Sequence, residues 1–379
     1  MRAIWILVSN TSKAEQGHVM IILYLALKKD QTMAHVQIGD REIGEGRPIF
    51  IMADLGLTNG GDLGRAKELI AVAADIGVDA VKFQMIEAER LLGDHSIEYT
   101  YPTLAHGPRT ENMLEMFKGL EFSDEEWAEI VATARSHGID IIITSHYEGA
   151  VARCNSLDLT INKICTWSLS HRRMIEMLAE NGKPLMFDTG TITQFELLKL
   201  EDIYRKAGGG PLIVLHDFHT PEEEDMNFRA FEVYRQLGMV AGYTPQGRSD
   251  WLDYMSVGLG AKVLEKRLTL DRNTPANGHW KAHEPEEFKD WLANVRRCET
   301  ALGRPVVEPT RIDRRDTKLY YKSAFLLRDV EAGAPIRQED LEFKRPGHGV
   351  SSHQVTERLV GFPYPRAFKA GEMLEWGQD

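Results

Sequence analysis

The chain has 379 residues and a formal net charge of −12, with 43% hydrophobic and 27% charged residues. This composition is typical of a globular protein with one large and one small domain, and its acidity argues against general binding to nucleic acid. The three cysteines, Cys154, Cys165 and Cys298, have no CxxC spacing. They predict a reducing compartment, the cytoplasm, and no zinc site.

The first 32 residues need separate treatment. Two apolar runs, 4–8 and 18–27, are far shorter than the ~20 residues that span a bilayer, so we expect no membrane partner. A signal peptide is one interpretation, but Lys28-Lys-Asp30 follows the second run where a small-residue cleavage site would lie. We favour a natural start at Met33, with a β-hairpin over 34–43, and expect residues 1–32 to carry no chemistry.

From residue 49 onward, short apolar runs alternate with segments of helical periodicity. Several of the runs are almost wholly apolar, as expected for parallel strands that are covered on both faces. The pattern predicts a (β/α)8 TIM barrel rather than a doubly wound sheet. The predicted strands are 49–54, 80–84, 139–144, 161–164, 184–188, 212–216, 239–243 and 262–266. The predicted helices are 63–76, 124–137, 172–180, 194–207, 228–237, 251–259 and 286–302.

Two segments depart from this alternation. Residues 86–118, with Tyr99, Tyr101 and His106, are expected to form an active-site loop because they are long for a barrel connection. Beyond the barrel domain, 33–308, residues 309–320 are expected to be a linker. Residues 321–379 predict a small β-rich domain that docks on another surface, because about sixty residues bury little core alone.

Charged and polar side chains end several of the predicted strands. Asp54, Lys82 and Gln84 follow the first two strands, and Lys163 ends the fourth. Active sites of such barrels lie at the carboxyl ends of the strands. A single lysine there is usually a solvated one, but two at equivalent positions favour a site for phosphate or carboxylate.

Histidine and hydroxyl residues end other strands. His216 could bind a divalent metal or act as a general base, and a histidine that is merely hydrogen-bonded at a strand end is equally compatible with the segment. Thr144-Ser-His-Tyr147 and Asp188-Thr-Gly-Thr191 carry hydroxyl and backbone N–H groups that can hold phosphate oxygens. Neither of these four-residue segments is specific on its own. No dinucleotide fingerprint, phosphate-binding P-loop or zinc-protease motif occurs.

A set of longer motifs follows one order along the chain. They are Ala53-Asp-Leu-Gly56 with Asn59-Gly-Gly-Asp62, Ile76-Gly-Val-Asp-Ala-Val-Lys-Phe-Gln84, Lys163-Ile-Cys-Thr-Trp-Ser168, Asp188-Thr-Gly190, Gly260-Ala-Lys-Val-Leu-Glu-Lys-Arg-Leu-Thr-Leu-Asp-Arg272 and Lys344-Arg-Pro-Gly-His-Gly349. From about residue 36 to its end, the chain therefore resembles the sialic acid synthase (NeuB-type, nonulosonate synthase) family. The last motif resembles that of the antifreeze-like (SAF) domain of this family.

The resemblance implies a condensation of phosphoenolpyruvate with an open-chain aldose such as N-acetylmannosamine, giving a 3-deoxy-ulosonic acid and phosphate. It implies a Mn²⁺ or Mg²⁺ ion as Lewis acid and a domain-swapped homodimer. The residues it assigns are Asp54 and His216 for catalysis; Lys82, Ser145, Lys163, Thr166, Asp188 and Thr189 for phosphoenolpyruvate; Gln84, Ser168 and Arg345 for the sugar; and His216 with Gln246 for the metal.

Four positions depart from the family pattern. Asp54 stands where the family has glutamate, and Gln246 stands where it has the second metal histidine. Ser168, beside Trp167, replaces a sugar-recognising glutamate, and Arg267 replaces a histidine. An amide oxygen is a weaker ligand for manganese than imidazole. Together these changes predict an altered sugar acceptor, an altered reaction or the loss of the standard one.

Three hypotheses follow, in order of preference. The first is a phosphoenolpyruvate-condensing synthase with an altered acceptor. The second is a metal-independent aldolase or lyase that acts on a related keto acid. The third is a non-catalytic paralogue that binds a sugar acid or scaffolds a partner. The charged residues at the strand ends argue mildly against the third, since a scaffold does not require them.

Overall fold

The structure is a computed structural model that describes residues 35–217 and 223–377. Residues 1–32, for which we expect no chemistry, lie outside the described part. The chain divides into two units, one ending at Gly303 and one beginning at Arg304. Within the described residues, no helix is both long and apolar enough to cross a membrane.

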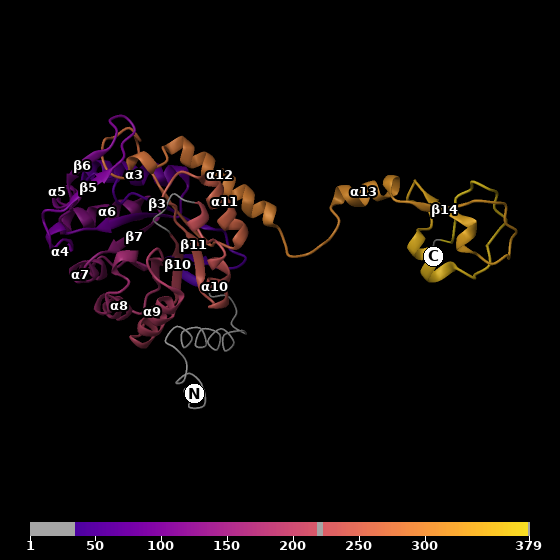
Figure 1. Cartoon of the computed structure of the whole chain (residues 1–379), viewed down its shortest axis with the longest axis horizontal. Helices are drawn as coiled ribbons and strands as arrows, with labels where there is room; N and C mark the ends of the chain where they lie inside the picture. Colours follow the sequence, from indigo (N-terminus) through magenta and orange to yellow (C-terminus); the bar gives the residue numbers. More distant parts are fainter. Residues whose placement is uncertain (1–34, 218–222, 378–379) are drawn as a thin grey trace, which may run out of the picture. The chain divides into compact units, whose positions relative to one another are not determined.

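The first unit is a closed barrel of eight parallel strands, which confirms the predicted (β/α)8 fold (Figure 1). Each predicted strand overlaps an observed one. The strands are β3 (Phe50–Asp54), β4 (Ala80–Met85), β7 (Asp140–Ser145), β8 (Asn162–Ile164), β9 (Leu185–Asp188), β10 (Leu212–His216), β11 (Val240–Tyr243) and β12 (Val263–Arg267). The ring closes because β12 pairs with β3, with Arg267 opposite Asp54.

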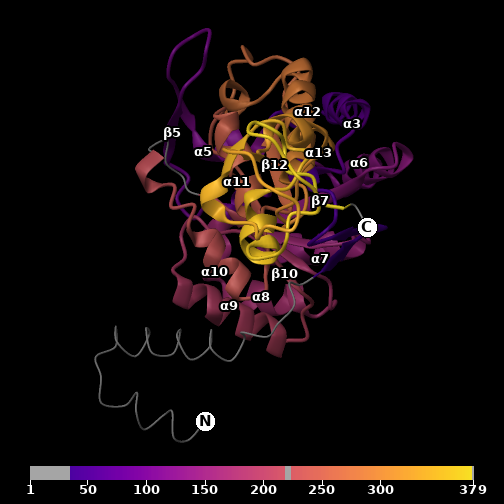
Figure 2. The same cartoon turned by 90° about the vertical axis from the view of Figure 1, so that its right-hand side faces the viewer.

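Helices surround this ring of strands in both views of the chain (Figures 1 and 2). They are α3 (Leu63–Ile76), α6 (Asp124–Ser136), α7 (Glu148–Ser156), α8 (Arg172–Ala179), α9 (Gln194–Lys206), α10 (Ala230–Gln236), α11 (Asp250–Leu259) and α12 (Pro285–Leu302). Ser123 and Glu126 form a capping box at the start of α6. The sequence did not predict α7, whose buried residues are only Ala150, Val151 and Cys154.

Alternate residues of each strand point to opposite faces, which divides the barrel into two cores. The inner core includes Phe50, Met52, Ile142, Met186 and Val263. The outer core lies between the strands and the helices and includes neighbours such as Ile51, Ile143 and Leu264. The parity of a strand residue therefore decides whether its side chain can reach the barrel mouth.

A short antiparallel hairpin precedes the barrel, as predicted. Strand β1 (Val36–Ile38) pairs with β2 (Arg41–Ile43). The buried side chains of Val36, Ile38 and Ile43 belong to the inner core of the barrel. Arg41 forms ion pairs with Asp79 and with Asp140, the first residue of β7. The hairpin thus fills the amino-terminal end of the barrel.

The segment expected to be an active-site loop, 86–118, has structure of its own. It contains α4 (Ala88–Leu91), a hairpin of β5 (Glu98–Tyr101) and β6 (Arg109–Asn112), and α5 (Met113–Lys118). The hairpin projects from the barrel in Figure 2. Asn112 caps α5 by accepting a hydrogen bond from the backbone of Glu115.

The second unit is small and has its own core. Strand β13 (Ser323–Leu326) pairs with β14 (Leu341–Lys344), followed by α14 (Ser352–Gln354) and a π-helical turn at Val355–Leu359. Its buried apolar residues include Leu326, Ile336 and Phe368. Residues 311–320, expected to be a linker, instead form helix α13 (Arg311–Tyr320), with Thr310 and Asp313 as its capping box.

Candidate active site

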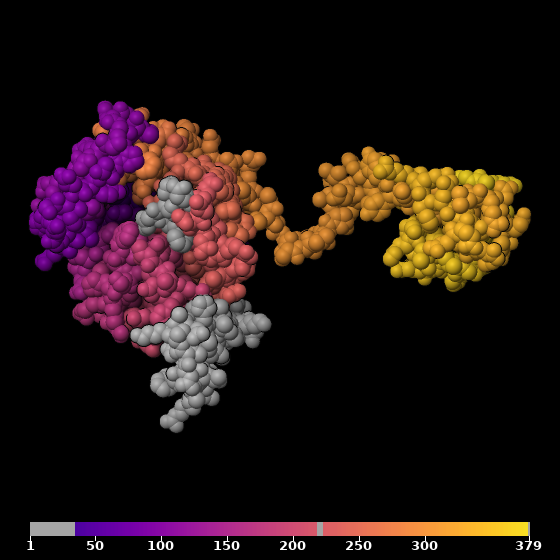
Figure 3. Space-filling view, in the orientation of Figure 1, coloured from indigo at the N-terminus to yellow at the C-terminus, as the bar shows by residue number. Residues whose placement is uncertain are grey.

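A cavity of about 670 Å³ lies at the carboxyl ends of the barrel strands. In the space-filling view, the first unit is hollowed between its indigo and magenta segments (Figure 3). The polar residues that line the cavity include Asp54, Lys82, Gln84, His146, Thr166, Ser168, Asp188, Asp217, Gln246, Glu265, Arg267, Asn277 and Lys281. This is the end of the barrel at which the active sites of this fold lie.

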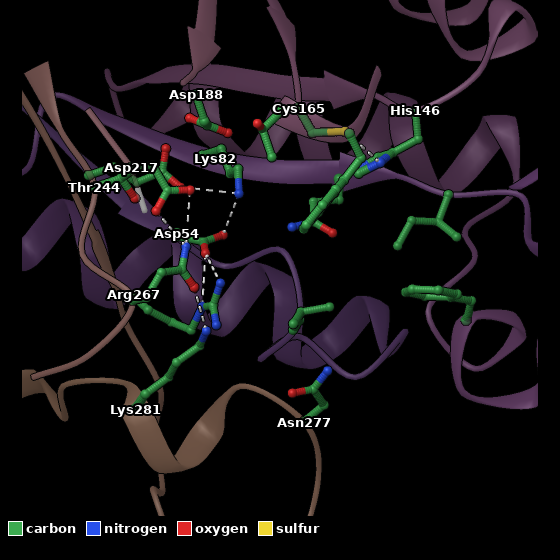
Figure 4. Close-up of a pocket in the computed structure, with 18 of the residues that line it drawn as sticks. Asp54, Lys82, His146, Cys165, Asp188, Asp217, Thr244, Arg267, Asn277 and Lys281 are labelled. Carbon is green, nitrogen blue, oxygen red and sulfur yellow. Dashed lines mark hydrogen bonds and ion pairs between the residues drawn. The ribbon is translucent and has the colours of Figure 1, made fainter. Parts of the chain in front are cut away.

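Asp54 is the centre of the charged network (Figure 4). Its Oδ1 accepts from Lys82 Nζ at 3.1 Å, and its Oδ2 accepts from Arg267 Nε and Nη2 at 2.9 and 2.7 Å. Burial alone would raise the pKa of Asp54, but Lys82 and Arg267 outweigh it and hold the pKa well below its ordinary value. Asp54 is therefore a fixed anion that orients two cations.

Glu265 joins the two predicted lysines. Its Oε1 lies 3.2 Å from Lys82 Nζ, and its Oε2 lies 3.2 Å from Lys163 Nζ. Burial opposes the charged form of Lys82, but the Asp54 and Glu265 carboxylates overcome this and raise its pKa. Lys163 also pairs with Asp188 at 2.8 Å, and its pKa is raised by Asp188 and Glu265 against the effect of burial.

Lys163 differs from Lys82 in its access to the cavity. Its side chain is fully buried, and it is not among the residues that line the cavity. Asp188 and Glu265, which bind its ammonium group, do line it. In this structure Lys163 therefore lies beneath the carboxylates of the cavity floor, and it is Lys82, Arg267 and Lys281 that present positive charge to the cavity.

A second polar group occupies the ends of β10 and β11. Gln246 Nε2 donates to both carboxylate oxygens of Asp217, at 2.9 and 3.1 Å. Gln246 Oε1 accepts from Lys281 Nζ at 2.8 Å. Burial, reinforced by the Asp188 carboxylate, raises the pKa of Asp217 to about 7. Burial, reinforced by Arg267, lowers the pKa of Lys281 to about 7.

The predicted metal ligand His216 lies outside the cavity, which corrects the expectation for this residue. It has the outward parity of β10, because Leu215 points into the inner core. Its Nε2 donates to the carbonyl of Met226 at 2.7 Å, so its Nδ1 accepts from the Tyr234 hydroxyl at 3.0 Å. Aromatic rings, including that of Phe231, surround it, and burial lowers its pKa to about 4.

These residues do not fit the divalent ion that the resemblance implies. Both ring nitrogens of His216 already have protein partners, and the carbonyl oxygen of Gln246 is bound to Lys281. Throughout residues 35–217 and 223–377, no three His, Cys, Asp or Glu side chains are grouped as a metal shell. The donor set needed to hold Mn²⁺ or Mg²⁺ at His216 and Gln246 is not assembled.

Two hydroxyl residues predicted to bind phosphoenolpyruvate also point away from the cavity. Ser145 has the outward parity of β7, and its Oγ lies 3.5 Å from Cys154 Sγ. Thr189 contacts the carbonyl of Leu215 and lines a separate surface hollow. Both lie one residue away from a position that faces inward, so the structure does not bring these two residues, which the resemblance assigns to phosphoenolpyruvate, into the cavity.

The other predicted residues of the barrel do line the cavity. Gln84, Thr166, Ser168, Asp188 and Gln246 are all among its lining residues. The Thr166 hydroxyl lies 2.9 Å from that of Thr191 and accepts from the Thr191 backbone at 3.0 Å.

Arg345 belongs to the second unit, and its contacts are with Tyr320 of the same unit. Its Nε donates to the carbonyl of Tyr320 at 3.0 Å, and its guanidinium lies 5.1 Å from the centre of the Tyr320 ring. Its assignment to the sugar remains a prediction.

The sequence reasoning missed several cavity residues. Glu265 is one of them, and it alternates with the inward-facing Val263, so strand parity could have identified it; Arg267, which the family comparison already singled out, follows on the same face. Cys165 follows Lys163 by two residues, and its Sγ lies 3.4 Å from His146 Nδ1. Burial, with Lys82, lowers the pKa of His146 to about 4. Lys281 comes from the long connection after β12 and carried no sequence signal.

One wall of the cavity is apolar. It is contributed mainly by α4, α5 and their neighbours, and comprises Leu57, Ile86, Leu91, Leu92, Met113, Met116 and Phe117, with Tyr99 and Trp167 at its exposed edge. Of the three aromatic residues noted in the 86–118 segment, Tyr99 lines the cavity, whereas the Tyr101 hydroxyl binds Glu111. The cavity therefore has a charged end and an apolar end.

Comparisons with known proteins agree with this architecture. The chain is 31% identical to an uncharacterized protein of Methanocaldococcus jannaschii, over 86% of this chain and 93% of the relative. It is 29% identical to the N,N'-diacetyllegionaminic acid synthase of Legionella pneumophila, over 89% and 96% of the two chains. The crystal structure of the N-acetylneuraminic acid synthetase of Leptospira borgpetersenii has a similar fold, with a TM-score of 0.67, 24% identity, and coverage of 76% and 96%.

The model of the NeuB family matches residues 69–307, which include most of the barrel and every cavity-lining residue except Asp54 and Leu57. The relatives above extend the similarity beyond this range on both sides. This chain belongs to the NeuB family.

Proposed function

We propose that this enzyme condenses phosphoenolpyruvate with an aldose to give a 3-deoxy-ulosonic acid and phosphate, with an acceptor that differs from N-acetylmannosamine. Family membership supports a condensation of this class. The observation that carries the proposal is the convergence of Lys82 and Arg267 on Asp54 within the cavity. Phosphoenolpyruvate carries a phosphate and a carboxylate, which are the groups that lysine and arginine bind.

The charged network prepares these two cations for an anionic ligand. Asp54 binds Lys82 through one oxygen and Arg267 through the other, so both cations are held in position before a ligand binds. Glu265, anchored beneath by Lys163, fixes the opposite side of the Lys82 ammonium group. Positive charges held in place before the ligand arrives require little reorganisation when it binds.

The apolar wall and the altered residues support a changed acceptor. Ser168 and Trp167 stand at the rim where the resemblance implies a glutamate that recognises the sugar. Loss of that carboxylate removes a hydrogen-bond acceptor for sugar hydroxyls. Methionine and phenylalanine side chains of α5 line the same cavity. An aldose with fewer exposed hydroxyl groups matches these surroundings better than N-acetylmannosamine.

In the same proposal, the second unit is an SAF domain and the enzyme is a domain-swapped homodimer in which Arg345 contacts the sugar of the partner subunit. The matching motif at residues 344–349 and the separate core of this unit support this assignment. Sedimentation of the full chain tests the dimer. Arg345→Ala should raise the KM for the aldose more than the KM for phosphoenolpyruvate, and equal changes in both would contradict this role.

The central test is release of phosphate from phosphoenolpyruvate across a panel of aldoses, assayed with and without Mn²⁺, with mass spectrometry of the keto acid formed. We expect turnover with at least one aldose and loss of turnover in Lys82→Met. Lys206→Met, at an exposed position on α9 that pairs with Asp202, is the matched control and should behave as the native enzyme. Failure of every aldose under both conditions would refute the proposed reaction.

A further inference from the structure

Lys281 contacts one of the two residues to which the family resemblance assigns a metal ion. Its ammonium group is bound to Gln246, the residue that stands in for the second metal histidine. Lys281 also lines the cavity, together with Arg267, Asp217 and Thr244 (Figure 4). The protein chain itself therefore contributes a cationic side chain to this end of the cavity.

The orientation of the Gln246 amide is fixed by its two neighbours. An amide donates through its nitrogen and accepts through its oxygen. Here the nitrogen donates to Asp217 and the oxygen accepts from Lys281. Reversing the amide would place its oxygen against a carboxylate and its N–H groups against an ammonium group. The pairing thus keeps Gln246 Oε1 on Lys281 and holds Nζ in a defined position.

Lys281 has hydrogen-bonding capacity beyond its contact with Gln246, and its side chain lines the cavity. A lysine ammonium group has three N–H donors. Within the described residues, one of them is matched to Gln246 Oε1, and the other contact of Nζ is with the Trp280 ring, whose centre is 6.0 Å away. A carbonyl oxygen in the cavity would be a suitable partner for the other N–H groups.

Resting on the proposed function, we infer that the Lys281 ammonium group, in place of a divalent ion, polarises the aldehyde oxygen of the acceptor. The methylene carbon of phosphoenolpyruvate forms a bond to the aldehyde carbon, and the carbonyl π pair moves to the oxygen that Lys281 faces. Water adds its oxygen to C2 of phosphoenolpyruvate, and one water proton goes to the new alkoxide. The C2–O bond to phosphate breaks, and phosphate leaves with the other proton. Lys281 stabilises charge and loses no proton overall.

The first experiment measures metal dependence by two independent readouts. The full-length enzyme is stripped with a chelator, and Mn²⁺ binding is followed by electron paramagnetic resonance while phosphate release is followed with an active aldose. We expect no Mn²⁺ binding at micromolar concentration and less than a twofold change in turnover. Stoichiometric micromolar binding, or turnover that is lost with chelator and restored by Mn²⁺, would overturn the inference while leaving the proposed function intact.

The second experiment isolates Lys281. Lys281→Met should lower kcat by about 10²–10³-fold, whereas the dissociation constant for phosphoenolpyruvate, measured by calorimetry, should change less than threefold. Lys281→Arg should recover part of kcat because it retains the charge. Lys262→Met is the matched control, since Lys262 is partly buried and pairs with Glu45 away from the cavity. An unchanged kcat in Lys281→Met would refute the role, and inactivity of the native enzyme with every aldose would instead refute the proposed function.

Discussion

Strand β12 carries buried charges on both of its faces, and the two faces meet very different surroundings. Inward, Glu265 and Arg267 join the network of Lys82 and Asp54 beside an open cavity. Outward, Lys266 is enclosed, with Asp253 at 2.5 Å and Asp250 at 2.8 Å. Neighbouring residues of one strand thus line a cavity on one face and form a buried structural cluster on the other.

The outward cluster has no space for a ligand. Lys266 and Asp253 are essentially inaccessible to solvent, and the indole N–H of Trp291 on α12 donates to the same Asp253 oxygen at 3.0 Å. Asp250 also meets His283 at 2.9 Å. The ion pairs of this cluster therefore tie β12 to α11, and the Trp291 hydrogen bond ties α11 to α12. Comparison of the two faces shows that access to a cavity, rather than the presence of buried charges, distinguishes the candidate site from a structural cluster.

The largest expected effect on stability lies in the outward cluster. Lys266→Met should lower the free energy of unfolding by about 3–5 kcal/mol, because it leaves the Asp253 carboxylate buried without its cation. Urea denaturation measures this loss. Lys206→Met should stay within about 0.5 kcal/mol as an exposed control. The double variant Lys266→Met/Asp253→Asn should recover part of the loss. A loss below about 1 kcal/mol in Lys266→Met would remove the distinction between the two faces.

Substitution in the inward cluster should affect catalysis strongly and stability only weakly. Lys82→Met should lower kcat/KM for phosphoenolpyruvate by about 10²–10³-fold. Its cost in unfolding free energy should be smaller than that of Lys266→Met, because Asp54 keeps Arg267 and Glu265 keeps Lys163. Steady-state kinetics and urea denaturation on the same preparations separate the two quantities. Equal stability losses for the two lysine variants, with little change in kinetics, would contradict the assignment.

Acidification should lower the free energy of unfolding through His216, which is buried on the outer side of β10. The unfolded chain binds a proton with a pKa near 6.5, whereas burial lowers the pKa in the folded protein to about 4. The unfolded state therefore binds more protons between these values, and stability falls as the pH falls. From pH 7 to pH 5 we expect His216 to contribute a loss of about 2 kcal/mol.

Denaturation at both pH values measures this dependence, and His216→Gln should reduce it. His353→Gln is the control, because His353 is 82% exposed in the second unit. An undiminished pH dependence in His216→Gln would show that His216 is not buried in its neutral form.

The smallest expected effect tests strand parity itself. Ser145→Ala should change the KM for phosphoenolpyruvate less than twofold, because the Ser145 hydroxyl faces Cys154 on the outer side of β7. Thr166→Val should have a larger effect on KM, since Thr166 lines the cavity. Initial-rate kinetics with varied phosphoenolpyruvate decide between them. A greater than tenfold increase in KM for Ser145→Ala would place that hydroxyl in the site after all.

Much of the barrel could be predicted because each strand is marked by a short run of apolar residues that are consecutive in the sequence. Runs of apolar residues that end in Asp54, Lys82 or Asp188 mark strands directly, and their carboxyl ends meet at one mouth in this fold. The helix α7 was missed because Glu148 to Ser156 lacks an extended apolar pattern. The charged run Arg311–Arg315 predicts a linker rather than helix α13, and in the structure no residue of this helix is buried.

The errors in the site have a different origin. A motif match does not tell an inward residue from an outward one: Asp217 rather than His216 lines the cavity, and Ser145 faces away from it. The pairing of Gln246 with Lys281 joins residues from two separate connections, which no local pattern reveals. Motif resemblance identified the mouth of the barrel, but the strand register decided which side chains reach it.

The β1–β2 hairpin has a consequence for the order of events during turnover. Because it fills the amino-terminal end of the barrel, ligands that reach the described cavity do so from the carboxyl ends of the strands. A ligand bound on the cavity floor beside Lys82 must enter before a second ligand that covers it, and it must leave after that second ligand. Under the proposed function, this single entrance predicts that phosphoenolpyruvate, bound on the floor beside Lys82, enters the cavity before the aldose.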